Sequence, residues 1–269
     1  MLQCGDEANG GIAVGEPEIS DILYGALRLY QPLEADGPRV NVDTVLLAHF
    51  ARFPARARVL EMGCAHGAIS LILARRMADS ERRAPMLDAF DLNETLVGMA
   101  NRNAALNGLA DRVRFFAFDL RRYRELCPSE RYDAVIMNPP YDEPGRSRPS
   151  ADAAVAAAKH GSGCTFREVA EAAKYFLKNR GRFFLVMRAN RCAEAMHILH
   201  ETKLEPKRLR AVHPKPNRKA SVVLLEAVRS GGGGLTIEPP LLIFGEDGRY
   251  TEGLLAAYRT QREKRPCRS

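Results

Sequence analysis

The chain has 269 residues, of which 46% are hydrophobic, and a formal net charge of +7 at pH 7. This length suits one sizeable core with a small appendage. Since no run of about 18 apolar residues exists, no transmembrane helix is expected, and the polar, glycine-rich N-terminus does not resemble a secretory signal. The six cysteines contain no C-x-x-C pair, which argues against structural zinc and disulfides and favours a reducing, cytoplasmic location.

Positive charge gathers in two segments. Residues 203–219 contain seven Lys or Arg residues against one Glu, and residues 259–269 contain five against one. Basic clusters of this kind suit a polyanion such as nucleic acid. A solvated basic surface accounts for the charge alone equally well.

Strand and helix patterns alternate along the chain after a lead-in over 1–20, which is expected to be flexible. Asn93 is the expected N-cap of the second helix, Gly108 its stop, and residues 165–168 form a capping box before the third. The last two strands have only a turn between them, which predicts a hairpin and one antiparallel strand at that edge. The expected strands are 58–61, 86–92, 112–120, 132–138, 181–190, 207–214 and 220–228, and the expected helices are 68–77, 93–108, 166–177 and 192–203.

This alternation predicts an α/β fold with a seven-stranded, mostly parallel sheet and helices on both faces. The core domain is expected over 21–230. A glycine-rich joint begins at Gly231, and the extension over 231–269 is expected to contain a short strand, a turn and a helix that packs back on the core, followed by a basic tail.

Polar side chains stand at the ends of four predicted strands: Glu61, Asp91, Asp119 and Asn138. In an open parallel sheet, ligands bind beyond the carboxyl ends of the strands. Each of these residues alone is explained as a helix cap. Four in series, with a glycine turn after the first, predict a common crevice.

The glycine turn reads E61-M-G-C-A-H-G67 and resembles the cofactor loop of S-adenosylmethionine-dependent methyltransferases, E/D-x-G-x-G-x-G, with Ala65 in the middle slot. Glycines let the backbone approach a ligand that carries no phosphate, and an acid can meet its ammonium group. Asp91 would accept hydrogen bonds from both ribose hydroxyls, and Asp119 one from the adenine amino group. Leu92 and Phe118 would form apolar walls.

The stretch N138-P-P-Y141 follows the strand over 132–138. The side-chain oxygen of Asn138 and the carbonyl oxygen of Pro139 can each accept one N–H of a planar amino group, which localises its lone pair for methyl transfer. Tyr141 offers a π-face to an extruded base, a contact worth roughly 1–3 kcal/mol. The motif therefore predicts methylation of an exocyclic amino group.

The motifs VLEMGCAHG, DLNE, FAFDL and NPPY together resemble the amino-methylating branch of class I methyltransferases, which have a Rossmann-like fold. Residues 31–51, 217–227 and 241–258 are further similar to bacterial tRNA(Val) (adenine-N(6))-methyltransferases, which act on the adenine just 3′ of the anticodon. The resemblance covers roughly residues 21–260. Two departures from it are Ala65, in place of the usual glycine, and the bulky His66.

The resemblance implies S-adenosylmethionine as cofactor and a role for each matching residue. Asn138, Pro139 and Tyr141 would hold the base, and a segment containing Arg39, Val42 and Asp43 would close over the methionine end of the cofactor. The complete expected cofactor set is Arg39, Val42, Asp43, Glu61, Gly63, Ala65, Gly67, Asp91, Leu92, Phe118, Asp119 and Asn138.

The expected partner is RNA, and tRNA in particular, with no membrane and no metal, and a monomer is favoured. The expected RNA contacts are Arg146, Arg148 and Lys159, in a loop over 143–163, and Lys215, Arg218 and Lys219, in the last turn. Two alternatives stay open. A protein glutamine methyltransferase also uses NPPY but needs no basic stripe and usually carries a helical domain before the core. An inactive fold that only binds RNA would not need an intact NPPY.

Overall fold

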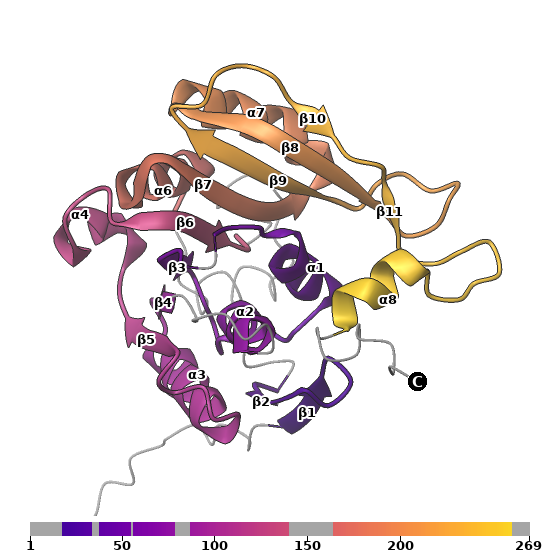
Figure 1. Cartoon of the computed structure of the whole chain (residues 1–269), viewed down its shortest axis with the longest axis horizontal. Helices are drawn as coiled ribbons and strands as arrows, with labels where there is room; N and C mark the ends of the chain where they lie inside the picture. Colours follow the sequence, from indigo (N-terminus) through magenta and orange to yellow (C-terminus); the bar gives the residue numbers. More distant parts are fainter. Residues whose placement is uncertain (1–17, 34–37, 55, 79–86, 140–163, 260–269) are drawn as a thin grey trace, which may run out of the picture.

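The computed structural model describes residues 18–33, 38–54, 56–78, 87–139 and 164–259. Its centre is a nine-stranded sheet in the order β10-β8-β9-β7-β6-β3-β4-β5, with β11 also paired to β8 (Figure 1). Every pairing is parallel except those of β9 with β7 and β8. The strands are β3 Val59–Met62, β4 Leu87–Asp91, β5 Val113–Ala117, β6 Tyr132–Met137, β7 Leu177–Arg188, β8 Leu204–His213, β9 Val222–Arg229, β10 Thr236–Ile237 and β11 Leu241–Leu242.

Helices cover both faces of the sheet, as predicted. One hydrophobic cluster joins the first face to α1 (Val42–Phe50), α2 (Ala68–Ala78), α3 (Glu94–Leu106) and α8 (Glu252–Tyr258). A second joins the other face to α4 (Tyr123–Leu126), α6 (Phe166–Phe176) and α7 (Cys192–Glu201). Successive strand residues such as Val59 and Leu60 belong to different clusters, which is the alternation of a sheet buried on both sides.

Local signals set the helix ends where they were expected. The Asn93 side chain accepts hydrogen bonds from the backbone N–H groups of Thr95 (3.0 Å) and Leu96 (3.2 Å), and α3 ends just before Gly108. The capping box of Thr165 and Glu168 is complete, with both reciprocal hydrogen bonds present. These caps satisfy backbone donors that the first turn of a helix leaves unpaired.

Several boundaries differ from the sequence prediction. β7 begins at Leu177 rather than 181, because the chain leaves α6 at Phe176 and pairs with β6 at once. β9 is the predicted antiparallel strand, but β10 and β11 extend the sheet past β8, so it has nine strands rather than seven. β1 (Glu18–Ile22) begins inside the lead-in expected to be flexible and forms a hairpin with β2 (Leu27–Gln31), which was not predicted.

Two asparagines of α3 attach the hairpin to the core. The Asn103 side chain accepts from the N–H of Tyr30 (2.7 Å) and donates to its carbonyl (3.0 Å), and Asn107 pairs with Arg28 in the same way. Each amide thus replaces a neighbouring strand for one residue of β2. Asn103 also donates to the carbonyl of His66 (3.0 Å), so the hairpin is tied to the glycine turn.

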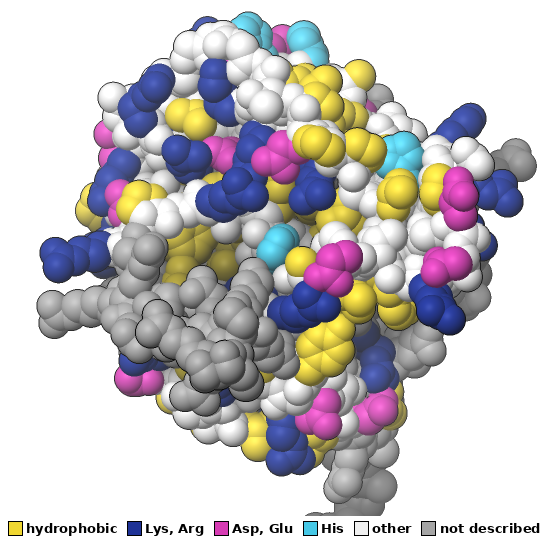
Figure 2. Space-filling model, turned by 45° about the vertical axis from the view of Figure 1, so that its right-hand side comes forward, with side chains coloured by type: hydrophobic (Ala, Val, Ile, Leu, Met, Phe, Trp, Pro, Cys, Tyr) yellow, Lys and Arg dark blue, Asp and Glu magenta, His cyan; other side chains and the backbone are white. Residues whose placement is uncertain are grey.

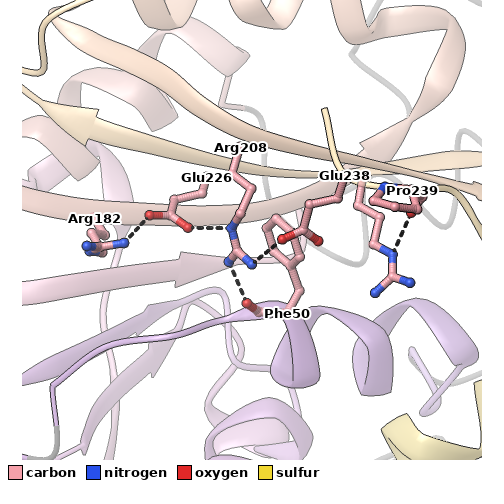
Figure 3. Close-up of polar contacts among 7 residues, drawn as sticks. Phe50, Arg182, Arg208, Glu226, Glu238 and Pro239 are labelled. Atoms are coloured by element: carbon pink, nitrogen blue, oxygen red, sulfur yellow. Dashed lines mark hydrogen bonds and ion pairs between the residues drawn. The ribbon is translucent and has the colours of Figure 1, made fainter. Parts of the chain in front are cut away.

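An ion-pair network fixes the C-terminal extension to the core (Figure 3). Arg208 of β8 contacts Glu226 of β9 (2.8 Å) and Glu238 (3.0 Å), and it donates to the carbonyl of Phe50 at the end of α1 (2.7 Å). Arg182 of β7 also pairs with Glu226, whose side chain is buried. A buried carboxylate with two Arg partners has the compensation that burial of charge requires.

This network corrects the reading of the basic segment 203–219 as one polyanion surface. Arg208 forms its contacts within the network. The amine of Lys207 donates to the carbonyls of Gly232 and Gly233. Arg210 donates to the carbonyl of Pro239 (3.1 Å). All three therefore hold the extension. The exposed basic residues Lys215, Arg218 and Lys219 are in the turn that follows β8.

Candidate active site

A cavity of about 390 Å³ lies at the carboxyl ends of the parallel strands. Glu61, Asp91, Asp119 and Asn138 all line it, so the structure brings together the four polar residues that the sequence placed at strand ends. The parallel register of β3 with β4 and β6 puts these ends side by side. The volume falls in the range of about 300–1,000 Å³ that is typical of small-molecule sites.

Glu61, at the end of β3, is 1% exposed. Its Oε2 accepts hydrogen bonds from the backbone N–H of Ser70 (2.9 Å) and from the Ser70 hydroxyl. Burial raises the pKa of Glu61 to about 8 although these two bonds oppose the rise. In the free protein the carboxyl group is therefore mainly protonated at neutral pH, and an ammonium group beside it would favour the carboxylate.

The glycine turn keeps the backbone path that its pattern predicts. Gly63 has φ of +69°, and Ala65, in the slot where the pattern has glycine, adopts φ of +47°. An alanine can occupy this left-handed region at a cost in strain. The substitution therefore preserves the glycine-like path of the loop.

Asp91 organises this turn from the end of β4. Its Oδ2 accepts from the backbone N–H of Ala65 (2.8 Å), and its Oδ1 accepts from that of Asn93 (2.9 Å). A carboxylate oxygen can accept two hydrogen bonds, so each keeps capacity for one ligand hydroxyl.

Gly67 does not line the cavity. A Cβ atom at this position would lie 2.8 Å from Cζ of Phe115 and 3.0 Å from Cβ of Ala100. The residue is therefore required for close packing of the turn against β5 and α3, which is a different use from the predicted cofactor contact.

Apolar side chains line the cavity beside Asp119. Leu92 and Phe118 are among the lining residues, and Phe118 packs edge-on against Phe90 with ring centroids 5.5 Å apart. The carboxylate of Asp119 accepts two hydrogen bonds from the guanidinium of Arg121 (2.9 and 2.6 Å), which lowers its pKa and keeps it ionised.

The segment before α1 covers part of the cavity. Arg39 lines it and pairs with Glu18 (2.8 Å), whereas Val42 and Asp43 start the helix without lining the cavity. Gln31 holds this segment by accepting from the backbone N–H of Val40 (2.7 Å).

Three polar lining residues were not predicted: Asn41, Thr44 and His66. Asn41 caps α1 by accepting from the N–H of Thr44 (3.0 Å), and its place before an apolar helical run was a readable signal. His66 was noted only as a departure from the family pattern. Its ring is buried, and neither nitrogen makes a hydrogen bond of good geometry with the described residues, although the Pro38 backbone lies close enough to act on the ring. Burial and the charge of Arg39 lower its pKa to about 4, against the opposing effect of the Pro38 backbone.

The start of the NPPY motif lies at the end of β6. Asn138 lines the cavity and Pro139 is buried. Tyr141 lies outside the described residues, as do Arg146, Arg148 and Lys159. Over the described ranges, no helix has the length and apolarity needed to cross a membrane, and no group of three or more His, Cys, Asp or Glu side chains is placed to hold a metal ion.

This fold, with its glycine turn and acidic strand ends, defines a class I methyltransferase, whose methyl donor is S-adenosylmethionine. The family model of the methyltransferase small domain matches residues 39–205, and the chain belongs to that family.

Known proteins resemble the chain over most of its length. A tRNA1(Val) (adenine(37)-N6)-methyltransferase of Dickeya chrysanthemi is 28% identical over 225 residues, which are 82% of this chain and 86% of the relative. A protein of the same name from Aeromonas hydrophila is 28% identical over 214 residues, 80% and 86% of the two chains. The crystal structure of a predicted O-methyltransferase from Agrobacterium tumefaciens matches with a TM-score of 0.64 at 20% identity, over 81% of this chain and 97% of that one, and supports the fold.

Proposed function

We propose that this protein transfers the methyl group of S-adenosylmethionine to the exocyclic amino group of an adenine next to the anticodon in a tRNA. The observation that carries the proposal is the convergence of Glu61, Asp91, Asp119 and Asn138 on one cavity. The names of the Dickeya and Aeromonas relatives, which match most of the chain, support the choice of tRNA adenine. A tRNA substrate implies a cytoplasmic enzyme.

The residues of the cavity fit the cofactor, which supplies a methyl group on a positively charged sulfur. The buried Glu61 would meet the ammonium of the methionine end, near Arg39 in the covering segment. Asp91 retains acceptor capacity for the two ribose hydroxyls. The ionised Asp119 would accept from the adenine amino group, with Leu92 and Phe118 against the ring.

Asn138 and Pro139 would act on the target amino group. The Oδ1 atom of Asn138 and the carbonyl oxygen of Pro139 would each accept one N–H, so that the nitrogen lone pair points toward the methyl group. Acceptors held rigidly where positive charge develops stabilise the transition state. Tyr141 would stack on the target base.

The variant Asn138→Ala tests this assignment. We expect its single-turnover methylation rate on tRNA to fall by a factor of about 100 or more, as when one preorganised donor is lost from an oxyanion hole. Its affinity for S-adenosylmethionine should change far less than the rate, because the Asn138 side-chain oxygen is assigned to the target amino group. A near-normal single-turnover rate would rule out the amino-methylation mechanism.

Mass spectrometry of bulk tRNA nucleosides, from cells with and without the gene, identifies the product independently. The proposal requires N6-methyladenosine to be lost from tRNA. Methylation of a protein glutamine, with tRNA unchanged, would instead support the alternative enzyme class.

The basic turn after β8 would contact tRNA phosphates. Lys215, Arg218 and Lys219 are exposed there, and the antiparallel pairing of β9 with both β7 and β8 puts this turn on the carboxyl side of the sheet, as the cavity is. Replacing all three by Ala should weaken tRNA binding and flatten its decline between about 50 and 200 mM salt, since each phosphate contact releases counterions. An unchanged salt dependence would leave the loop over 143–163, with Arg146, Arg148 and Lys159, as the proposed RNA contact.

A further inference from the structure

The hairpin between β11 and α8, residues 243–251, is part of the stretch that resembles the tRNA enzymes, but the cavity does not use it. The rings of Phe244 and Tyr250 stack across its base, with centroids 4.9 Å apart and planes 23° from parallel. Tyr250 is 56% exposed. The hairpin thus presents an aromatic face to solvent.

Backbone hydrogen bonds give this hairpin a fixed shape. The N–H of Gly245 donates to the carbonyl of Arg249 (2.8 Å), and the N–H of Gly248 to that of Gly245 (3.1 Å). The Asp247 carboxylate accepts from the backbone N–H of Arg249 (3.0 Å), so its charge is directed to the hairpin's own backbone. A preformed aromatic face loses little entropy when a ligand stacks on it.

The hairpin and the basic turn after β8 are joined. The N–H of Ile243 donates to the carbonyl of His213 (2.9 Å), and that of Phe244 to the carbonyl of Pro214 (3.0 Å). Within the turn, the carbonyl of Arg218 contacts Nδ1 of His213 (2.7 Å). Both loops project from the same end of the molecule (Figure 1), and many Lys and Arg side chains lie on the face shown in Figure 2.

Contacts other than the aromatic pair attach the extension to the core. Leu241, Leu254 and Ala257 are buried in the core, and the Arg208 network adds polar contacts. The two loops together carry Lys215, Arg218, Lys219 and Arg249 against Glu246 and Asp247, so they remain net positive. An exposed aromatic ring beside basic side chains is the arrangement with which proteins stack unpaired bases and hold the adjoining phosphates.

We infer that Tyr250, on the hairpin over 243–251, stacks an unpaired base of the tRNA while Lys215, Arg218 and Lys219 pair with neighbouring phosphates. This platform lies outside the cofactor cavity and rests on the proposed function. It would hold the anticodon arm by shape and charge and leave recognition of the target base to the cavity.

The variant Tyr250→Ala separates stacking from charge. Its affinity for an anticodon stem-loop RNA should fall by a factor of about 5 to 150, the usual range for loss of one base–aromatic stack. Its salt dependence should stay parallel to that of the wild type, because an aromatic contact releases no counterions. Tyr250→Phe should bind normally, and cofactor affinity should not change in either variant.

A direct readout uses the absence of tryptophan from the sequence. Tyr250→Trp keeps an aromatic face and introduces a single indole, whose fluorescence should be quenched when the RNA binds. Ile237→Trp is the matched control, because Ile237 is 69% exposed on β10, away from the basic turn. Lys203→Ala with Arg180→Ala controls for charge, since both residues are exposed at the opposite ends of β8 and β7.

The outcomes are distinct. An unaltered affinity of Tyr250→Ala, or equal quenching at positions 250 and 237, overturns the platform while tRNA methylation by the wild type still supports the proposed function. A wild type that neither binds nor methylates tRNA refutes both.

Discussion

Replacing Glu61 by Gln should slightly destabilise the folded protein at acidic pH and stabilise it at alkaline pH. The pKa of Glu61 is about 8 in the folded protein and 4.5 in the exposed reference state. Between these values the folded protein keeps a proton that the unfolded chain has released, so the free energy of unfolding falls as pH rises. The difference of about 3.5 between the two pKa values corresponds to a loss of about 5 kcal/mol, which is complete above pH 8.

The amide of Gln is neutral throughout this range, and its oxygen can accept the same two hydrogen bonds from Ser70. Its NH₂ group carries no charge, so burial brings no charge-desolvation penalty. As a buried donor without a hydrogen-bond partner, however, it costs about 1–3 kcal/mol. Near pH 5 we therefore expect Glu61→Gln to be slightly less stable than the wild type. Near pH 8.5 it should be more stable, because the difference between the variants changes by about 4 kcal/mol across the interval.

Urea denaturation of the cofactor-free protein from pH 5 to 8.5 measures this change. Glu61→Ala would be a poor substitute, because it leaves Ser70 without an acceptor. Parallel stability profiles for wild type and Glu61→Gln would refute the raised pKa. In the same proteins, S-adenosylmethionine should release a proton on binding to the wild type and none on binding to Glu61→Gln, as seen by calorimetry in two buffers of different ionisation enthalpy.

Three further substitutions probe the glycine turn and its partners. Asp91→Ala should weaken S-adenosylmethionine binding tenfold or more, since a lost acceptor for buried donors costs about 1–3 kcal/mol; equal affinities by calorimetric titration would remove Asp91 from the site. Ala65→Gly relieves the strain of a left-handed alanine, worth roughly 1–2 kcal/mol, but adds chain entropy worth about 0.5–1 kcal/mol, so a net gain in unfolding free energy of up to about 1.5 kcal/mol is expected in urea. His66→Leu should stabilise the free protein by about 1 kcal/mol because it removes a buried ring whose nitrogens make no hydrogen bond of good geometry; a clear loss of melting temperature would show that the contact with the Pro38 backbone outweighs this gain.

The strand ends were predictable because their chemistry is local. Glu61, Asp91, Asp119 and Asn138 each follow an apolar run directly, and parallel strands must bring their carboxyl ends to one edge. The caps at Asn93 and Thr165 were readable for the same reason, since a cap depends on the next three residues.

Residues whose role depends on a distant partner could not be read from the sequence. Gly67 matched a cofactor pattern, yet Phe115 and Ala100, which are remote in the chain, require it to be glycine. The sequence groups Arg208 with a predicted nucleic-acid surface. In the structure its guanidinium instead bonds to Glu226, Glu238 and the carbonyl of Phe50. One short strand was expected in the extension, but the structure has two, β10 and β11, and their pairing with β8 could not be read from so few residues.

That pairing also covers the edge of β8, which we expect to disfavour self-association. Without β10 and β11, the ten residues of β8 would form the edge of the sheet and offer a long row of backbone donors and acceptors to another chain. Strands of two residues offer too few backbone groups to pair with a strand of another chain. The side chains of Lys207 and Arg210 also donate to the carbonyls of Gly232 and Pro239 in the extension. A chain shortened at Gly231 should therefore fail first by aggregation, even with every residue of the cavity intact.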